Sequence, residues 1–393
     1  MPWNETSAMD QRRHFIADYL EAYFPFSELC RRYGISRPTG YKWVQRYSDA
    51  GVAGLIEQSR RPDSCPHATS SDLVEAILEA RRKHPTWGAK KLLALLQRSQ
   101  PHRPWPARTT VCDILKRHGL VPTRRTRRRP SSTRPPQTPL SEPNHVWTAD
   151  FKGQFKTLDG RYCYPLTVVD GYSRFLLGCQ ALDAPQGRLS RPVFHRLFRT
   201  YGLPRIIRTD NGAPFASSQA LGRLSQLSVW WIRLGILPER IQPGCPHQNG
   251  RHERLHGTLK REATIPPAGS RFAQQYRFTR FRHEYNQERP HEALQQQTPV
   301  EFYQASPRPF PRKLPPLHYP AHWEVRLVSG NGGIRWKTHR LAVTHALRQQ
   351  PIGLEPIDDG VWEVWFGPLR LGRMDERQLT ITDRSSKTVD RKL

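Results

Sequence analysis

The chain has 393 residues, with 62 lysines and arginines against 34 aspartates and glutamates, and a formal net charge of +28 at pH 7. With a pI near 10.5, the expected partner is a polyanion, above all nucleic acid, because lysine and arginine release the counterions condensed on phosphates. The sequence shows neither an apolar stretch of the roughly 20 residues that span a bilayer nor an opening signal peptide. We therefore expect a cytoplasmic protein of two to four domains with no membrane partner.

The N-terminal part has the spacing of three short helices. Ser36 is a suitable N-cap for the third helix, and Gly34 supplies a tight turn before it. In that helix we expect Tyr41, Val44 and Tyr47 to face the interior. The opposite face presents the candidate DNA contacts of a helix-turn-helix, namely Arg37, Thr39, Lys42 and Arg46.

A second helical unit follows, with leucine, isoleucine and valine at helical spacing, and a linker comes after it. The helical unit carries three further candidate DNA contacts, Lys90, Lys91 and Arg108. The linker is rich in proline, which excludes a helix, and we expect its basic cluster to run along phosphates. That cluster consists of Arg124, Arg125, Arg127, Arg128 and Arg129.

An α/β pattern begins near residue 146. Three strands joined by short turns predict an antiparallel meander, at Trp147–Leu158, Tyr162–Asp170 and Arg174–Leu182. Beyond them the pattern predicts alternating helices and short strands. These are a helix at Arg191–Tyr201, a strand at Arg205–Arg208, a helix at Ser217–Leu234, a strand at Arg240–Gln242, and helices at Asn249–Arg261 and Arg271–Gln287, the last with Phe278, Phe281 and Tyr285 on one face.

The C-terminal part alternates apolar and polar residues and is rich in aromatic residues, which predicts a small all-β barrel or sheet, and we take the barrel as the expected form. The chain is thus expected to be multidomain, with N-terminal all-α helix-turn-helix units, a central α/β core built on a mixed five-stranded sheet with helices, and this barrel. The predicted boundaries are 1–60 and 61–121 for the helix-turn-helix units, 122–145 for the basic linker, 146–304 for the core, 305–320 for a Pro-rich linker, 321–380 for the barrel and 381–393 for a basic tail.

Three acidic residues of the core stand in settings suited to metal-dependent phosphodiester chemistry. Asp150 lies on the first predicted strand, Asp210 ends the fourth, and Glu253 lies on a helix. Two divalent ions about 4 Å apart can activate a nucleophile and stabilise a leaving oxygen. Mg²⁺ takes oxygen ligands and keeps several waters, so two or three carboxylates suffice to hold it.

Neighbouring residues have predicted supporting roles. Asn211 and Gly212 allow a sharp turn directly after Asp210. Lys260 lies seven residues beyond Glu253, hence on the same helical face, where we expect it to hold substrate phosphate.

Three motifs of the core together carry a specific resemblance. They are Thr148-Ala149-Asp150-Phe151, Arg208-Thr209-Asp210-Asn211-Gly212 and Gln248-Asn249-Gly250-Arg251-His252-Glu253-Arg254. The chain resembles the bacterial insertion-sequence transposases with a retroviral-integrase-type core. The run Tyr285-Asn286-Gln287-Glu288-Arg289-Pro290-His291 and the pair Thr298-Pro299 look like the downstream block of that family. The resemblance covers nearly the whole chain.

The resemblance implies a ribonuclease H-like core with a DDE triad of Asp150, Asp210 and Glu253 as catalytic residues and metal ligands. It places Asn249 and Gly250 beside the triad. It also implies two Mg²⁺ or Mn²⁺ ions, hydrolysis that frees a 3′-hydroxyl at each transposon end, and attack of that hydroxyl on target DNA. The implied partners are double-stranded DNA, as terminal inverted repeats and as target, and further copies of the chain in a synaptic complex at the bacterial nucleoid.

The third acid has a rival. About 42 residues separate Asp210 from Glu253, more than is usual in the family, and an insertion around Ser225–Leu237 explains the excess. Glu239 lies closer to Asp210, but it precedes a predicted strand instead of standing on the helix. We therefore prefer Glu253.

Two other functions compete with the transposase interpretation. His252-Glu253-Arg254-Leu255-His256 matches the H-E-x-x-H helix of zinc peptidases, but a peptidase leaves the charge, Asp150 and Asp210 unexplained. A non-catalytic DNA-binding regulator derived from a transposase is the stronger alternative, and the intact set of three acids argues against it.

Overall fold

The computed structural model describes residues 7–57, 68–121, 138–217, 220–242 and 246–383. The chain divides into two compact units, Met1–Thr69 and Ser70–Leu393. The finer domain boundaries predicted from the sequence stay predictions.

The first unit is helical, as predicted. It contains α1 (Ala8–Glu21), α2 (Phe26–Arg32), α3 (Arg37–Ala50) and the 3₁₀ turn η1 (Gly51–Leu55). Ser36 caps α3 by accepting the Thr39 backbone N–H, and Gly34 makes its turn with a φ of +64°. The six buried apolar residues that these elements enclose are Phe15, Ile16, Leu29, Cys30, Trp43 and Leu55.

The predicted buried face of α3 was partly wrong. Tyr41 is 59% exposed and stacks on Phe26, whereas Trp43 is only 6% exposed. Gly40 brings α3 against α2 so closely that a Cβ there would lie 2.7 Å from Cys30 Sγ. This close approach turns Gly40 and Trp43 inward and leaves Tyr41 at the edge.

The second unit begins with three more helices, α4 (Ser71–Lys83), α5 (Ala89–Ser99) and α6 (Arg108–Arg117). They enclose their own apolar core, in which Trp87, Ile77, Leu92 and Val111 are completely buried.

A mixed sheet follows, in the order β2-β3-β1-β5-β6, with β4 also paired to β3. β1, β3 and β4 form the predicted antiparallel meander, and β5 and β6 continue it in parallel. The bounds are β1 Val146–Phe151, β2 Phe155–Lys156, β3 Tyr162–Asp170, β4 Leu176–Leu182, β5 Ile206–Thr209 and β6 Leu237–Arg240.

Three predicted elements differ from those observed. The first strand breaks near Gly153 into β1 and β2, so the sheet has six strands instead of five. The predicted helix Ser217–Leu234 is shorter, because the 3₁₀ turn η2 (Leu221–Arg223) precedes α8 (Gln226–Arg233). The predicted strand Arg240–Gln242 is β6, which lies earlier and contains Glu239.

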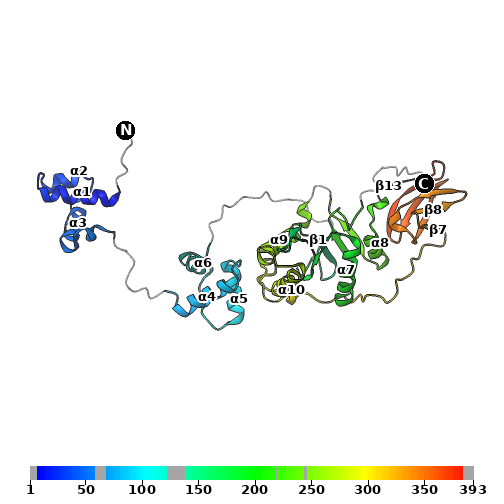
Figure 1. Cartoon of the computed structure of the whole chain (residues 1–393), viewed down its shortest axis with the longest axis horizontal. Coiled ribbons are helices and arrows are strands. Elements are labelled where there is room, and N and C mark those ends of the chain that lie inside the picture. The colour runs from blue at the N-terminus through cyan, green and yellow to red at the C-terminus, as the bar shows by residue number, and fades with distance from the viewer. Residues whose placement is uncertain (1–6, 58–67, 122–137, 218–219, 243–245, 384–393) are drawn as a thin grey trace. The chain divides into compact units, whose positions relative to one another are not determined.

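Helices cover both faces of the sheet (Figure 1). On one face α7 (Gly187–Tyr201) and α8 pack against Trp147 and Ala149 of β1. On the other face lie α9 (Gly250–Leu259), its π-helical continuation η4 (Lys260–Thr264) and α10 (Arg271–Gln287), which buries Phe278, Phe281 and Tyr285 as predicted. Because side chains alternate along a strand, Thr148 and Asp150 of β1 point toward the face of α9. The short helical elements η3 (Pro246–Asn249), η5 (Glu292–Leu294) and α11 (Pro299–Phe302) complete this part.

The C-terminal part is all-β, as predicted. Five strands form an open antiparallel sheet in the order β13-β12-β11-β10-β7, and β8 pairs with β9 in a separate hairpin. In the described part of the chain no ladder joins the sheet to the hairpin, so the closed barrel expected from the sequence is not what these strands form. The bounds are β7 Glu324–Leu327, β8 Gly333–Trp336, β9 His339–Ala342, β10 Pro351–Asp358, β11 Val361–Phe366, β12 Leu369–Asp375 and β13 Thr380–Asp383, with the 3₁₀ turn η6 at His345–Leu347.

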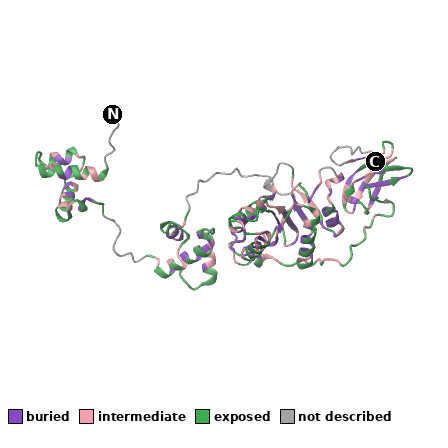
Figure 2. Cartoon of the chain, viewed as in Figure 1, coloured by how far each residue is buried: buried purple, intermediate pink, exposed green. Residues whose placement is uncertain are grey.

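This β region shares its hydrophobic core with the segment around α8. Leu221, Leu224, Val229 and Ile232 are buried together with apolar residues of the strands. The buried residues in Figure 2 accordingly continue from the central sheet through α8 into the β region. The extra length between Asp210 and Glu253 thus supplies the surface on which the C-terminal strands pack.

No helix among the described residues is both long and apolar enough to cross a membrane.

Candidate active site

The three predicted acids come from three adjacent elements. β1 and β5 are parallel neighbours, with Thr148 opposite Arg208. Asp150 and Asp210 each follow two residues later, so they lie at the same end of the two strands. Glu253 lies in the first turn of α9, on the face of the sheet toward which Asp150 points. The structure therefore brings the three carboxylates to one edge of the sheet.

The electrostatics of Asp150 reflect this convergence. Burial, followed by the negative charge of Asp210 and then of Glu253, raises the pKa of Asp150 to about 7 against a backbone hydrogen bond that lowers it. Burial also raises the pKa of Asp210, although the Gly212 backbone N–H donates to this carboxylate at 3.2 Å. A cation among these oxygens would relieve the repulsion and favour their ionised forms.

Two cationic side chains lie at the same edge. Burial and then the charge of Lys260 lower the pKa of Lys152, which follows β1 directly. Lys260, the first residue of η4, is exposed, and its predicted contact with substrate phosphate stays a prediction. Lys152 was not predicted, because an isolated lysine after a strand gives no signal in the sequence.

The rival acid, Glu239, has a different role. Its carboxylate accepts from Arg208 Nε at 2.6 Å, and the two side chains are only 13% and 3% exposed, respectively. Thr138 also donates to it. Glu239 thus neutralises a buried guanidinium within the sheet.

The predicted supporting residues fix the loops around the acids. The Asn211 side chain donates to the Ile241 carbonyl at 2.8 Å, and that of Asn249 donates to Asp150 Oδ2 at 3.4 Å. A Cβ at Gly212 would stand 3.2 Å from Asp210 Oδ2, so a side chain there would crowd the carboxylate. Gly250 begins α9.

A buried network of two histidines and two threonines adjoins Asp150. His252 is 2% exposed, and its ring nitrogens lie 2.9 Å from Thr148 Oγ1 and 2.6 Å from Thr167 Oγ1. Thr167 Oγ1 also lies 2.8 Å from His256 Nε2. Since both nitrogens of His252 are engaged by threonines, the two histidines do not hold one ion in the manner of a zinc peptidase. The H-E-x-x-H pattern singled out these residues, but Thr167 on β3 could not be found from the sequence.

The segment from Tyr285 to His291, which carried part of the resemblance, makes hydrogen bonds to other elements of the core. The side chain of Asn286 bonds both the backbone N–H and the carbonyl of Leu176 on β4, at 2.8 and 3.0 Å. Arg289 donates to both carboxylate oxygens of Glu262, at 2.6 and 2.7 Å. These contacts join α10 to β4, and the segment after α10 to η4.

The predicted DNA contacts of α3 lie at or near the surface. Arg37 and Lys42 are exposed, and Thr39 lies beside the hydroxyl of Ser36. The guanidinium of Arg46 and the ammonium of Lys42 lie over the ring of Trp43.

The contacts predicted in the second helical unit are placed differently. Lys90 pairs with Glu292 at 2.6 Å, and Lys91 donates to the Pro290 carbonyl at 2.6 Å. Burial lowers the pKa of Lys91 to about 8. Both lysines thus face residues of the core, while Arg108 is exposed at the start of α6. The arginines predicted at positions 124, 125, 127, 128 and 129 lie outside the described residues.

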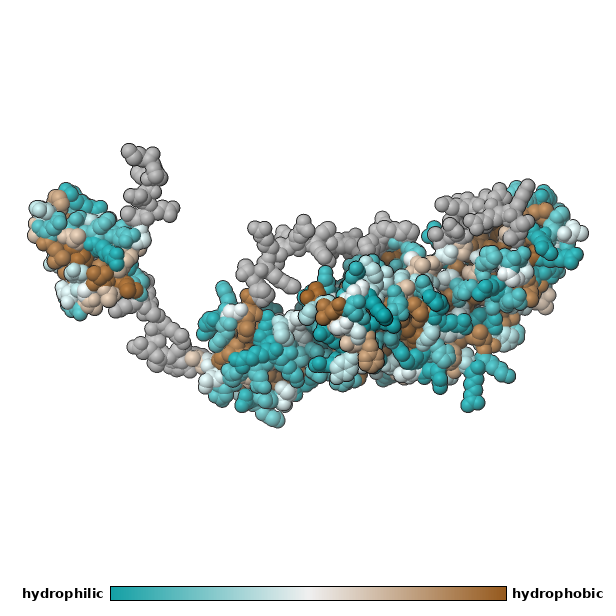
Figure 3. Space-filling model, in the orientation of Figure 1, coloured by the Kyte–Doolittle hydropathy of each residue, from teal (hydrophilic) through white to brown (hydrophobic). Residues whose placement is uncertain are grey.

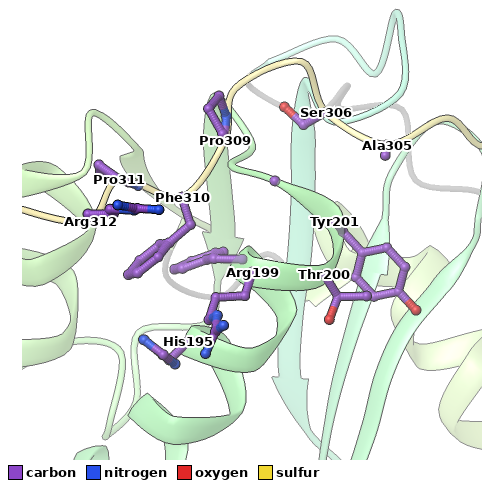
Figure 4. A pocket seen from close by; sticks show the side chains of 12 residues that line it. His195, Arg199, Thr200, Tyr201, Ala305, Ser306, Pro309, Phe310, Pro311 and Arg312 are labelled. Atoms are coloured by element: carbon purple, nitrogen blue, oxygen red, sulfur yellow. The ribbon is translucent and has the colours of Figure 1, made fainter.

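A cavity of about 600 Å³ lies apart from the acids, between α7 and the segment after the core (Figure 4). His195 and Arg199 of α7 lie close to Phe310 and Arg312 at this cavity, which Tyr201 also lines. The ring of Phe310 packs against His195, with centroids 4.9 Å apart. None of the predicted site residues lines this cavity.

Known families match most of the chain in segments. Residues 141–246 and 234–299 match "Integrase core domain", residues 6–56 and 39–115 match "Homeodomain-like domain", and residues 323–382 match "IS481 family transposase, C-terminal domain". The chain therefore combines homeodomain-like helix-turn-helix DNA-binding domains with an integrase core, and it is an enzyme of the transposase and integrase class. Together with the similar insertion-element proteins, these matches support a bacterial insertion-sequence transposase with an integrase-type core, as the sequence predicted.

Similar proteins include two from bacterial insertion elements. The insertion element IS407 uncharacterized 31.7 kDa protein of Burkholderia multivorans is 28% identical over 63% of this chain and 85% of its own length. The insertion element IS476 uncharacterized 39.2 kDa protein of Xanthomonas euvesicatoria is 28% identical over 64% of this chain and 70% of its own. Among solved structures, a simian T-cell lymphotropic virus intasome with the PP2A regulatory subunit B56 gamma is similar at a TM-score of 0.37 and 19% identity, covering 75% of this chain and 97% of that one.

Proposed function

We propose that this transposase binds the terminal inverted repeats of an insertion sequence, cleaves DNA to free 3′-hydroxyls and joins them to target DNA. The observation that carries the proposal is the convergence of Asp150, Asp210 and Glu253, since burial together with the charges of Asp210 and Glu253 raises the pKa of Asp150 to about 7. Three oxygen-donor side chains at one edge of a sheet fit the preference of Mg²⁺ and Mn²⁺.

In this proposal the three carboxylates would hold two divalent ions, which would supply activation of the water or 3′-hydroxyl and stabilisation of the leaving oxygen. Asn249 orients Asp150 through its amide, and Gly212 leaves room beside Asp210. Lys152 and Lys260 supply positive charge beside the acids, where the phosphate to be cleaved must lie.

DNA recognition is proposed for the exposed face of α3, with Arg37, Thr39, Lys42 and Arg46, joined by Arg108 and the arginines of the linker. In Figure 3 hydrophilic residues occupy much of the visible face of each unit, in keeping with the charge of +28. Two transposon ends must be processed together, so we further propose a synaptic homo-oligomer acting at the nucleoid.

A strand-transfer assay tests the proposal. The full chain is incubated with the DNA ends that flank its reading frame, a plasmid target and Mg²⁺ or Mn²⁺, with chelator in a parallel reaction. We expect joined products from the wild type and from folded Glu239→Gln, but none from Glu253→Gln or with chelator. Thermal melting verifies that each variant is folded.

The same assay distinguishes the proposed transposase from the alternative function, a non-catalytic regulator derived from a transposase. Tight binding to the ends by all proteins, without cleavage or joining by any of them, would favour the regulator. Loss of joining in Glu239→Gln alone, with the variant folded, would reassign the third acid.

A further inference from the structure

His252 and His256 stand one helical turn apart on α9, on the side that faces Asp150. One ring nitrogen of each histidine and a carboxylate oxygen of Asp150 lie within 4.8 Å of one another. Both rings are largely buried. An imidazole binds a metal ion in its neutral form, which carries a single N–H.

The hydroxyl of Thr167 determines which nitrogen of each ring carries that hydrogen. This hydroxyl has one hydrogen, and it donates to the backbone carbonyl of Asp150, which can only accept, at 3.1 Å. The Nε2 atoms of His252 and His256 approach the same oxygen at 2.6 and 2.8 Å. We assign the hydrogen of Thr167 to the Asp150 carbonyl, so that Thr167 accepts from both rings and each ring is protonated at Nε2.

The two Nδ1 atoms therefore carry lone pairs, and their surroundings differ. The Nδ1 atom of His252 lies 2.9 Å from the hydroxyl of Thr148, whose single hydrogen has this nitrogen and the Val169 carbonyl, 3.5 Å away, as acceptors. The Nδ1 atom of His256 faces Asp150 Oδ2 at 3.9 Å, a lone pair opposite a lone pair. Within the described part of the chain no hydrogen-bond donor reaches this nitrogen.

We propose that His256 Nδ1 and Asp150 Oδ2 bind the same divalent ion, so that one metal position of the active site has a nitrogen ligand besides its carboxylates. This inference rests on the proposed function, since it concerns one ion of the same site. A nitrogen and an oxygen that each bind one ion at about 2.1 Å can stand at most about 4.2 Å apart, and about 3 Å apart at a right angle. The observed 3.9 Å lies within that range.

An imidazole ligand changes which ions the position prefers. Mg²⁺ takes oxygen ligands almost exclusively, whereas imidazole suits transition metals, and Mn²⁺ accepts both kinds. His256 thus biases the site toward Mn²⁺ over Mg²⁺. His252 has a different role, because it holds Thr167 and thereby keeps the lone pair of His256 turned toward Asp150.

Pulsed electron paramagnetic resonance of Mn²⁺ bound to the full chain tests the inference without requiring activity. We expect a ¹⁴N coupling from one directly bound histidine in the wild type and its loss in His256→Gln. In the same variant Mn²⁺ affinity should fall about tenfold or more, and Mg²⁺ affinity by less than about twofold. His283→Gln, at a histidine whose side chain is 69% exposed, is the matched control and should behave as wild type.

If His256→Gln does not fold, labelling the wild type with ¹⁵N-histidine provides a second test. The coupling seen in the wild type must then change from the ¹⁴N to the ¹⁵N pattern, which shows that it comes from a histidine. Mn²⁺ that binds wild type but not Asp150→Asn, without any nitrogen coupling, would overturn the inference and leave the carboxylate site standing. Couplings from two histidines would overturn it by making His252 a ligand. Absence of Mn²⁺ binding in the wild type would overturn both the inference and the proposed metal site.

Discussion

At the scale of single residues, Asp150 is held where its ionised form is disfavoured. Its side chain is 19% exposed, and it shares its surroundings with Asp210 and Glu253. The folded protein raises the pKa of this carboxyl from 3.8 to about 7. Without metal, the contribution of Asp150 to stability is therefore fully present at low pH and is lost as the pH rises through about 7.

Asp150→Asn should consequently stabilise the metal-free protein at pH 8, by up to about 4 kcal/mol, because the amide carries no charge. The difference from wild type should shrink as the pH falls toward 4. Chemical denaturation in the presence of chelator measures both values. Equal stabilities of variant and wild type at pH 8 would mean that neither burial nor the neighbouring acids disfavours the ionised carboxyl in the folded protein.

The two candidate third acids differ in what their removal should do to stability. Glu239→Gln leaves the 3%-exposed guanidinium of Arg208 without its carboxylate, and we expect a loss of about 3–5 kcal/mol. Glu253 is exposed, so Glu253→Gln should change stability by less than about 0.5 kcal/mol.

Urea denaturation of both variants measures this contrast. The double variant Arg208→Met, Glu239→Leu is the control, and it should recover most of the loss because apolar residues can replace a buried ion pair. A Glu239→Gln variant as stable as the wild type would show that the ion pair does not stabilise the sheet.

At the scale of elements, the sequence predicted where helices and strands lie better than it predicted which of their side chains face the interior. Helical spacing located α3, yet both Tyr41 and Trp43 fit an apolar face, and only the contact of Gly40 with α2 decides between them. The motifs located Asp150, Asp210 and Glu253, because each acid stands in a recognisable local setting. They could not reveal Thr167 or Lys152, whose relevance arises from strand register and from charges distant in sequence.

The exposed face of α3 should contribute to DNA affinity through charge. Lys42→Gln removes one exposed cation from this face, so it should weaken DNA binding and reduce the slope of log affinity against log salt by about 0.9. Arg13→Gln, at an exposed position on α1, is the matched control and should leave the slope unchanged. Fluorescence anisotropy over a salt series measures both, and identical slopes for Lys42→Gln and wild type would exclude a phosphate contact by Lys42.

At the scale of the whole molecule, the segment between Asp210 and Glu253 connects the core that carries the acids to the C-terminal β region. The sequence indicated an insertion there, and the structure shows that Leu221, Leu224, Val229 and Ile232 form one hydrophobic core with the C-terminal strands. The sequence could not predict this contact, because its two sides lie about a hundred residues apart. The β region is therefore packed directly against the catalytic core.

Ile232→Ala should loosen that packing. Ile232 is 2% exposed, and its truncation should cost about 2–5 kcal/mol. We expect faster hydrogen exchange in β10, β11 and β12 as well as in α8, while α4–α6 keep their protection. Exchange that rises in α8 alone would indicate that the β region is stable without this contact.

The most direct test of the proposed active site is to locate Mn²⁺ by anomalous scattering in crystals of the full chain bound to its transposon ends. We predict ions coordinated by Asp150, Asp210 and Glu253, with Glu239 still paired to Arg208. Ions bound at Glu239, or bound away from Asp150 and Asp210, would contradict the assignment of the catalytic triad.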